Sequence, residues 1–130
     1  MMVAALTGIS PQVIADLKHG KPRTIELQSA HNIITLAEVQ PGDPLFLTSI
    51  APEDLSAGDS GIILEVQMIS ISMKRLIEYS HASFFEERER TSARVQLKYC
   101  GTSIIKEVNE VGCCRAARVD VVKSTCFHAV

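Results

Sequence analysis

The chain has 130 residues, of which 46% are hydrophobic and 22% are charged. This length and composition fit one globular domain, residues 1–130, with its own core, and they exclude a disordered chain. Thirteen Lys and Arg residues against fifteen Asp and Glu residues leave a formal net charge of −2, which argues against a protein that coats DNA by general electrostatics. A local basic patch that binds a short RNA or a phosphate remains compatible with this balance.

The first ten residues lack the basic region and the apolar run of a signal peptide, and no segment approaches the ~20 apolar residues of a membrane-spanning helix. We therefore expect a cytoplasmic protein without a membrane partner. The histidines and cysteines show none of the spacings typical of zinc or redox sites. We expect no metal and no cofactor, and reduced, buried or half-buried thiols, with a redox or metal role as the alternative, at Cys100, Cys113, Cys114 and Cys126.

The first elements are a buried strand and a helix. Residues 2–8 are apolar and suit a buried strand. Ser10 is a suitable N-cap for a helix over residues 11–19, because its hydroxyl accepts a free backbone N–H, and Pro11 fits the first helical position. Gly20 can adopt the left-handed conformation that ends a helix.

The pattern then changes to a period of two. Residues 24–28 alternate polar and apolar side chains, which predicts a strand with Ile25 and Leu27 facing inward. A second strand is predicted over residues 32–39, a turn over 41–44, a short buried strand over 45–48 and one helical turn over 52–56.

The strongest strand pattern covers residues 61–66 and can continue to Met73. Further strands are predicted over 93–99, 104–108 and 118–122. The segment 74–90 is open: a helix would pair Glu86 with Arg90, whereas an extended chain would place Arg88, Arg90 and Arg94 on one face suited to phosphate. Many short strands with one early packed helix predict an α+β protein built on a small curved β-barrel of mixed strands.

The stretch GKPRTIELQSAHN, residues 20–32, is the best candidate for a binding site. It places cations, a hydroxyl, a carboxylate and an amide close together beside the strand over residues 24–28, and cations of this kind suit phosphate or carboxylate. The alternative is an amphipathic edge strand whose polar face is simply solvated. The candidate residues are Lys21, Arg23, Thr24, Glu26, Gln28 and His31.

The first half of the chain resembles PUA-like domains, and among them the ASCH domain. The shared features are the helix over residues 11–19, a Gly-Lys-x-Thr-x-Glu-x-Arg-like pattern and a Gly-Asp turn before a buried strand, matched here by Gly20, Lys21, Thr24, Glu26, Gly42 and Asp43. Pro22 and Arg23 separate the Lys from the Thr, and Gln28 stands where the family tends to have Arg.

This resemblance implies a PUA-like fold and binding of RNA or a nucleotide. Lys21 and Arg23 would contact phosphate, and Thr24, Glu26 and Gln28 would read a base edge or a ribose. Some ASCH-like proteins hydrolyse modified nucleosides, which implies the alternative of a small amidohydrolase with Lys21, Thr24 and Glu26 as its catalytic residues. Whether the protein is an enzyme stays open.

A second resemblance covers nearly the whole chain. Segments such as RTIELQSAHNIIT, GDPLFLTS and EDLSAGDSGIILEV are similar to an archaeal family catalogued as domain of unknown function 473. This family brings no activity, cofactor or partner with it. A third hypothesis is therefore a non-catalytic interaction subunit or a homodimer, which an exposed aliphatic patch around Ile69, Ile71 and Met73 would favour.

Overall fold

The computed structural model describes residues 1–80, 84–110 and 116–122, with the backbone alone for 74–80, 84–90 and 110. The helices and strands follow in the order β1 (Met2–Leu6), α1 (Pro11–Leu17), β2 (Arg23–Leu27), α2 (Ala30–Ala37), β3 (Pro44–Leu47), a 3₁₀ turn (Pro52–Asp54), β4 (Ser60–Ser80), β5 (Phe84–Glu110) and β6 (Arg118–Val121).

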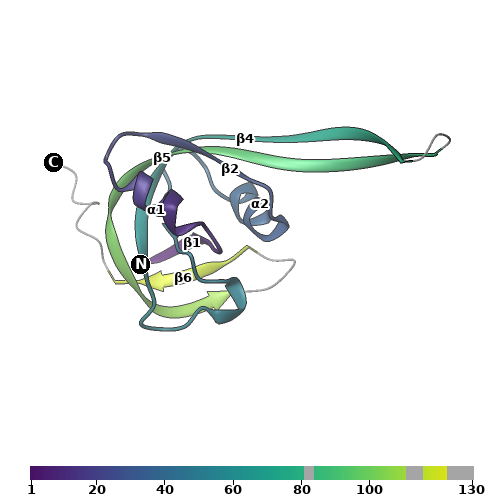
Figure 1. The fold of residues 1–130 in the computed structure, drawn as a ribbon. Coiled ribbons are helices and arrows are strands. Elements are labelled where there is room, and N and C mark those ends of the chain that lie inside the picture. Colours follow the sequence, from purple (N-terminus) through teal and green to yellow (C-terminus); the bar gives the residue numbers. More distant parts are fainter. Residues whose placement is uncertain (81–83, 111–115, 123–130) are drawn as a thin grey trace.

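The strands form one mixed six-stranded sheet in the order β2-β5-β4-β3-β1-β6, as Figure 1 shows. The β1–β3 pair is parallel and the other pairs are antiparallel. Because β5 also pairs with β6, the five strands β5, β4, β3, β1 and β6 form a closed ring of hydrogen-bonded neighbours. β2 lies outside this ring, at the edge of the sheet. The expected α+β class is confirmed by this arrangement, in which the residues that the structure describes form six strands and two helices.

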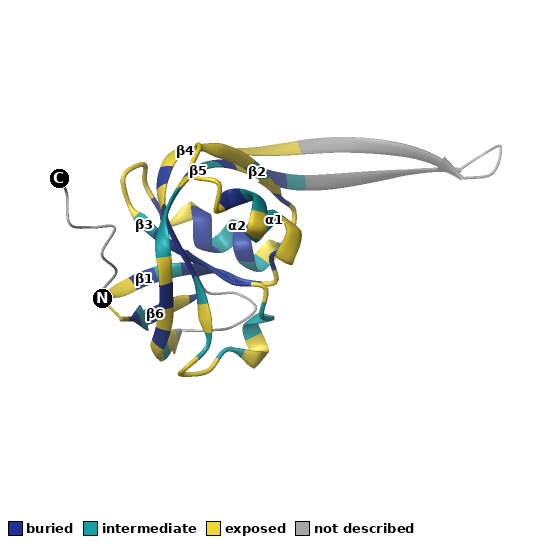
Figure 2. Ribbon diagram, turned by 60° about the vertical axis from the view of Figure 1, so that its left-hand side comes forward, coloured by how far each residue is buried: buried dark blue, intermediate teal, exposed yellow. Residues whose placement is uncertain are grey.

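The core lies on both faces of the central strands. Leu45 and Leu47 of β3 belong to one apolar cluster, whereas Phe46 between them belongs to a second cluster on the opposite face. Both helices cover the first cluster, to which they contribute Leu17 and Leu36. A strand that is buried on both faces carries a continuous apolar run, and this explains the sequence of β3 (Figure 2).

The early helix α1 is confirmed, with the predicted start. The Ser10 hydroxyl accepts a hydrogen bond from the Gln12 backbone N–H at 3.2 Å, and Pro11 occupies the first turn. Gly20 has a φ of 85°, a conformation that L-residues rarely adopt, so the chain can reverse here into β2.

The strand predicted over residues 32–39 is wrong, because this segment is the helix α2 and its C-terminal cap. The run of β-branched residues at Ile33 to Thr35 favoured a strand. Buried side chains instead recur with helical spacing, at positions i, i+3, i+4 and i+7, in Asn32, Thr35, Leu36 and Val39. The described part of the chain therefore has two packed helices, and the expectation of one early helix was incomplete.

The described parts of the open segment, residues 74–80 and 84–90, lie in the two long strands β4 and β5, whose register continues to the pair Ser80–Phe84. The helical alternative for residues 84–90 is therefore wrong. The pairing of β2 with β5 ends at Ala93, so residues 72–80 and 84–92 form a two-stranded arm that projects from the body (Figure 1). The predicted strands over 93–99 and 104–108 are parts of the single strand β5.

Several predictions concern residues outside the described ranges. They include the side-chain positions of Arg88 and Arg90 and the burial of Cys113, Cys114 and Cys126. Cys100 is described, and it lies half-buried on β5.

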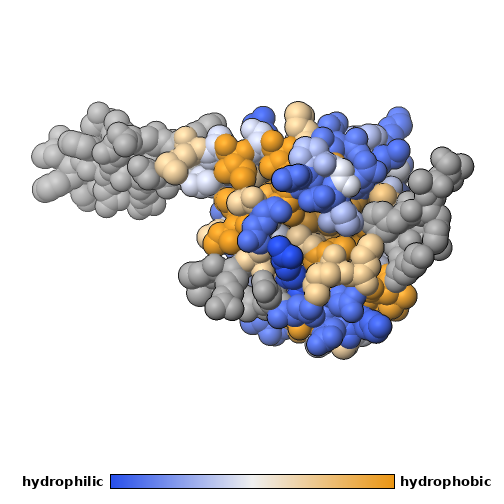
Figure 3. All heavy atoms as spheres, turned by 180° about the vertical axis from the view of Figure 1, so that it is seen from behind, coloured by the Kyte–Doolittle hydropathy of each residue, from blue (hydrophilic) through white to orange (hydrophobic). Residues whose placement is uncertain are grey.

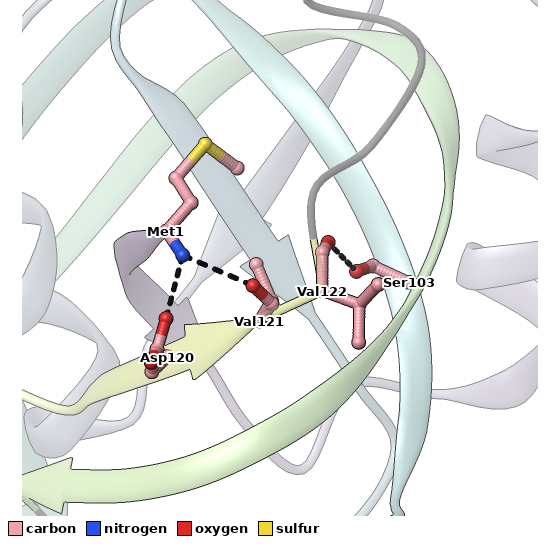
Figure 4. A network of polar contacts seen from close by, with 5 residues as sticks. All are labelled: Met1, Ser103, Asp120, Val121 and Val122. Atoms are coloured by element: carbon pink, nitrogen blue, oxygen red, sulfur yellow. Dashed lines mark hydrogen bonds and ion pairs between the residues drawn. The ribbon is translucent and has the colours of Figure 1, made fainter.

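Polar contacts link the start of β1 to the end of β6, as Figure 4 shows. The Met1 amine donates hydrogen bonds to Asp120 Oδ1 at 2.6 Å and to the Val121 carbonyl at 3.1 Å. This ion pair lowers the pKa of Asp120 below its ordinary value, chiefly through the hydrogen bond from the amine. Nearby, the Ser103 hydroxyl donates to the Val122 carbonyl at 2.8 Å and connects β5 to the end of β6.

Candidate functional site

Among the described residues, a cleft with a volume of about 480 Å³ lies between β2 and the segment that joins β1 to α1, and we call it the main cleft. Strand β2, helix α1, the β1–α1 loop and the start of α2 all contribute to its wall. The lining residues are Gly8, Ile9, Ser10, Val13, Asp16, Leu17, Arg23, Thr24, Ile25, Glu26, Leu27, Gln28, Ser29 and Asn32.

Strand β2 supplies most of the polar wall. It pairs with β5 in the register Arg23–Leu97 to Leu27–Ala93. Leu27 is buried in the core and Ile25 packs against it, as the alternating pattern predicted. Thr24, Glu26 and Gln28 are exposed. The arrangement gives one strand both an apolar anchor and a row of accessible polar groups.

The structure places four of the six candidate residues, Arg23, Thr24, Glu26 and Gln28, in the wall of the cleft. Lys21 is exposed in the loop between α1 and β2 and does not line the cleft. His31 lies half-buried on α2, also outside the lining, and its Nε2 atom is buried without a hydrogen-bond partner in the described part of the chain.

The opposite wall was missed by the sequence reasoning. It consists of residues 8–10 and of Asp16 and Asn32 on the two helices. None of these positions carries a binding motif: Ser10 is recognisable only as a helix cap, and Asp16 is one acidic residue on an otherwise ordinary amphipathic helix. They come together because α1 and α2 both pack against the same apolar cluster.

This opposite wall is held in place by backbone and side-chain hydrogen bonds. The Gly8 N–H donates to the Ile50 carbonyl at 2.9 Å, and the Ile9 N–H donates to the Thr48 carbonyl at 3.1 Å. The Asn32 amide bonds both polar groups of the Thr7 backbone, at 3.0 Å and 2.9 Å. A ligand would therefore meet a preformed surface on this side of the cleft.

The charges of the cleft are few and mixed. Among its lining residues, Arg23 is cationic, whereas Asp16 and Glu26 are anionic. A polyphosphate would be repelled by the two carboxylates. The arrangement suits a ligand with one anionic group, placed near Arg23, and with hydrogen-bond donors that reach the carboxylates, such as amino or hydroxyl groups.

A smaller groove of about 270 Å³ lies on the outer surface of the sheet next to the main cleft. It is lined by Glu26, Ser70, Ser72, Ser92 and Arg94, so Glu26 belongs to both cavities. These residues come from β2, β4 and β5, at positions that the sheet register brings side by side. We call this cavity the serine groove.

The described residues contain no group of three or more His, Cys, Asp or Glu side chains that could hold a metal ion. In the same ranges, neither helix has the length and apolar character needed to cross a membrane.

The family model described as "Protein of unknown function (DUF473)" matches residues 1–119. The chain is also 33% identical over 101 residues to the "Uncharacterized protein MJ0105" of the archaeon Methanocaldococcus jannaschii. That match covers 78% of this chain and 62% of the relative's length. No solved structure matches the chain. The resemblance to this archaeal family is thereby confirmed.

Proposed function

Because the chain belongs to the DUF473 family, whose description states no activity, we propose a function from the chain's own residues: it binds RNA or a nucleotide fragment in the main cleft. The proposal includes a cytoplasmic location. It also treats residues 1–130 as one PUA-like domain in which the closed ring of five strands is the small β-barrel.

The observation that supports this proposal is the composition of the cleft wall. Three hydrogen-bonding side chains of β2, Arg23, Thr24 and Glu26, together with Gln28 directly after the strand, line a cavity of about 480 Å³. That size falls within the range of small-molecule and nucleotide sites. Hydrophobic side chains, including Ile9 and Val13, line the same cavity and offer an apolar surface for the face of a base.

In the proposed binding mode, Arg23 contacts a phosphate and the neighbouring polar groups read the nucleoside. Thr24, Glu26 and Gln28 hydrogen-bond to a base edge or to ribose hydroxyl groups. Lys21, in the loop before β2, would contact a phosphate outside the cleft. His31, the remaining candidate, lies on α2 outside the cleft lining, and its buried Nε2 would contact a ligand only after the side chain turns outward.

The test is RNA binding at two salt concentrations with matched variants. We expect the wild type to bind a short single-stranded RNA at low salt, and Arg23→Gln to weaken this binding. Lys98→Gln is the control, because Lys98 is exposed on β5 and lines neither cavity. For single-stranded RNA, the slope of the logarithm of the binding constant against the logarithm of salt concentration changes by about 0.7 for each phosphate contact. Arg23→Gln should therefore reduce the size of this salt slope by about 0.7. No binding at low salt would refute the proposal.

The hydrolase alternative has less support from the geometry. It requires Lys21, Thr24 and Glu26 to act on one substrate, yet Lys21 does not line the cleft. Both Lys21 and Glu26 are exposed, so burial does not desolvate either group. Support for this alternative would require the release of a carboxylic acid or ammonia from modified nucleosides, and the loss of that release in Glu26→Gln.

A second candidate function is self-association through the root of the arm. Ile71 and Met73 are 44% and 65% exposed, and they continue the apolar face on which Ile69 packs against the core. Figure 3 shows hydrophobic side chains gathered at the surface where the arm leaves the body. A second copy of the chain would cover this patch, which favours the proposal of a homodimer.

A further inference from the structure

The serine groove is the strongest feature that the proposed function leaves unused. Its central residue is Arg94 on β5. In the register of the sheet, Glu26 of β2 lies opposite Arg94 on one side and Ser70 of β4 lies opposite it on the other. Directly opposed residues of this kind have Cβ atoms about 4.5–5.5 Å apart. One carboxylate, one guanidinium and one hydroxyl therefore form a continuous row across three strands.

The next row adds two more hydroxyl groups. Ser92 and Ser72 are opposite each other on β5 and β4, and their Oγ atoms are 3.4 Å apart. Because residues two apart on a strand share a face, these serines lie on the same side of the sheet as Arg94 and Ser70. Ser92 is 9% exposed, so its hydroxyl forms the floor of the groove rather than a solvated surface.

The guanidinium of Arg94 is available for a ligand. Arg94 is exposed, and within the described ranges no hydrogen bond or ion pair engages its side chain, including none with Glu26. A guanidinium with neighbouring hydroxyl donors matches the several acceptor oxygens of one phosphate group. The carboxylate of Glu26 limits the site to a single phosphate, because a second anion beside it would be repelled.

Glu26 connects this groove to the main cleft, since it lines both. Arg23 is opposite Leu97, three residues along β5 from Arg94, so the two cations are offset by about 10 Å along the strand and leave opposite faces of the sheet. Because β2 is the edge strand, a ligand that contacts both cations passes over the free edge of β2, and this path is longer than one phosphate group.

We propose that the serine groove is a phosphate subsite, and that the ligand is an oligonucleotide of at least two nucleotides. It would run from the main cleft, across Glu26, to Arg94 and the three serines. This inference rests on the proposed function and adds to it the length and the direction of the ligand. Glu26, at the junction, would accept a hydrogen bond from a ribose hydroxyl between the two phosphate contacts.

The test compares a ribonucleoside 5′-monophosphate, a ribodinucleotide with a 5′-phosphate and a labelled RNA hexamer, each titrated into four proteins: wild type, Arg23→Gln, Arg94→Gln and the control Lys98→Gln. We expect the wild type to bind the dinucleotide more tightly than the monophosphate. Arg94→Gln should weaken binding of the dinucleotide and the hexamer roughly tenfold, the effect of losing a charge-assisted contact. It should also reduce the salt slope by about 0.7 while leaving the monophosphate unaffected. Thermal unfolding of each variant checks that the fold is retained.

Two outcomes overturn the inference and are distinguishable. If Arg94→Gln binds the hexamer as the wild type does, or weakens no more than Lys98→Gln, the subsite is refuted. In that case a loss of binding in Arg23→Gln would leave the proposed function standing. If the wild type binds none of the three probes at low salt, both the subsite and the proposed function are refuted.

Discussion

Asn32 of α2 forms two hydrogen bonds with the backbone of Thr7, the residue that follows β1. Its Nδ2 donates to the Thr7 carbonyl at 2.9 Å, and its Oδ1 accepts from the Thr7 N–H at 3.0 Å. Asn32 is 3% exposed and Thr7 is 1% exposed, so neither backbone group has water as a substitute partner. The amide thus completes the hydrogen bonding of the chain at the point where it leaves the sheet and forms one wall of the main cleft.

Replacing this amide should destabilise the protein strongly. Asn32→Ala removes both hydrogen bonds and leaves a buried N–H and a buried carbonyl of Thr7 without partners. We expect the free energy of unfolding to fall by about 2–4 kcal/mol, as measured by urea titration. Gln12→Ala is the control, because the Gln12 amide bonds Asp16 on the surface of α1 at 3.2 Å. A loss of less than about 1 kcal/mol in Asn32→Ala would show that the buried groups find other partners.

Gly61, at the start of β4, should tolerate no side chain. A Cβ atom built at this position would clash with the ring of Phe46 and with the Leu47 carbonyl. Phe46 is fully buried, so its ring has no free space into which to move. Gly61→Ala should therefore lower the free energy of unfolding by roughly 1–3 kcal/mol. The neighbouring exposed Ser60→Ala should change it by less than about 0.5 kcal/mol, and equal effects of the two substitutions would contradict this account.

The contact between Met1 and Asp120 should make stability depend on acid pH. The pKa of Asp120 in the folded protein lies below its ordinary value of 3.8, because of the hydrogen bond from the Met1 amine, and the charges of that amine and of Lys106 act in the same direction. A lowered carboxyl pKa stabilises the fold above the unfolded-state value. This contribution is lost as the pH falls through that value and then through the lowered one.

For a chain that begins at Met1, we expect Asp120→Asn to reduce the fall of the unfolding free energy as the pH is lowered into the acid range. The difference in unfolding free energy between wild type and variant should be constant from about pH 6 to 5 and should shrink from about pH 4 downward. Acetylation of the Met1 amine should reproduce the effect of the substitution, because it removes the charge and the donor. A difference that does not vary with pH would show that the ion pair contributes nothing to folding.

The sequence predicted those parts of the fold that have a strong local signal. Ser10 and Pro11 mark the start of α1, and the alternation of Ile25 and Leu27 marks β2. The failure at α2 has a physical cause. β-Branched residues favoured a strand locally, whereas the hydrogen bonds between Asn32 and Thr7, and the one that the Ala117 N–H donates to Thr35 Oγ1 at 3.1 Å, form only in the folded protein. These contacts join residues 25 and 82 positions apart, and they produce no periodic pattern in the sequence.

Only the β2 wall of the candidate site was predictable, because it alone has a local signal in the sequence. The polar residues of β2 share a strand, so one stretch of sequence contains them. Asp16, by contrast, reaches the main cleft because α1 packs beside it, and a turn separates α1 from β2. Arg94 is far from β2 in sequence and reaches the serine groove because β5 pairs with β2. Lys21 follows α1 closely in sequence. It lies in the turn between Gly20 and the start of β2 at Arg23, and it does not line the cleft.

The exposed apolar residues at the root of the arm should control self-association. Ile71→Ser combined with Met73→Ser removes two side chains that are largely solvent-exposed, so the free energy of unfolding should change little. If a second copy covers this patch, sedimentation velocity should show a concentration-dependent dimer for the wild type and a monomer for the double variant. Met68→Ser is the control, because Met68 is 57% exposed but lies on the opposite face of β4 from these two residues. A wild type that stays monomeric up to high micromolar concentration would refute self-association, as would a double variant that dimerises as the wild type does.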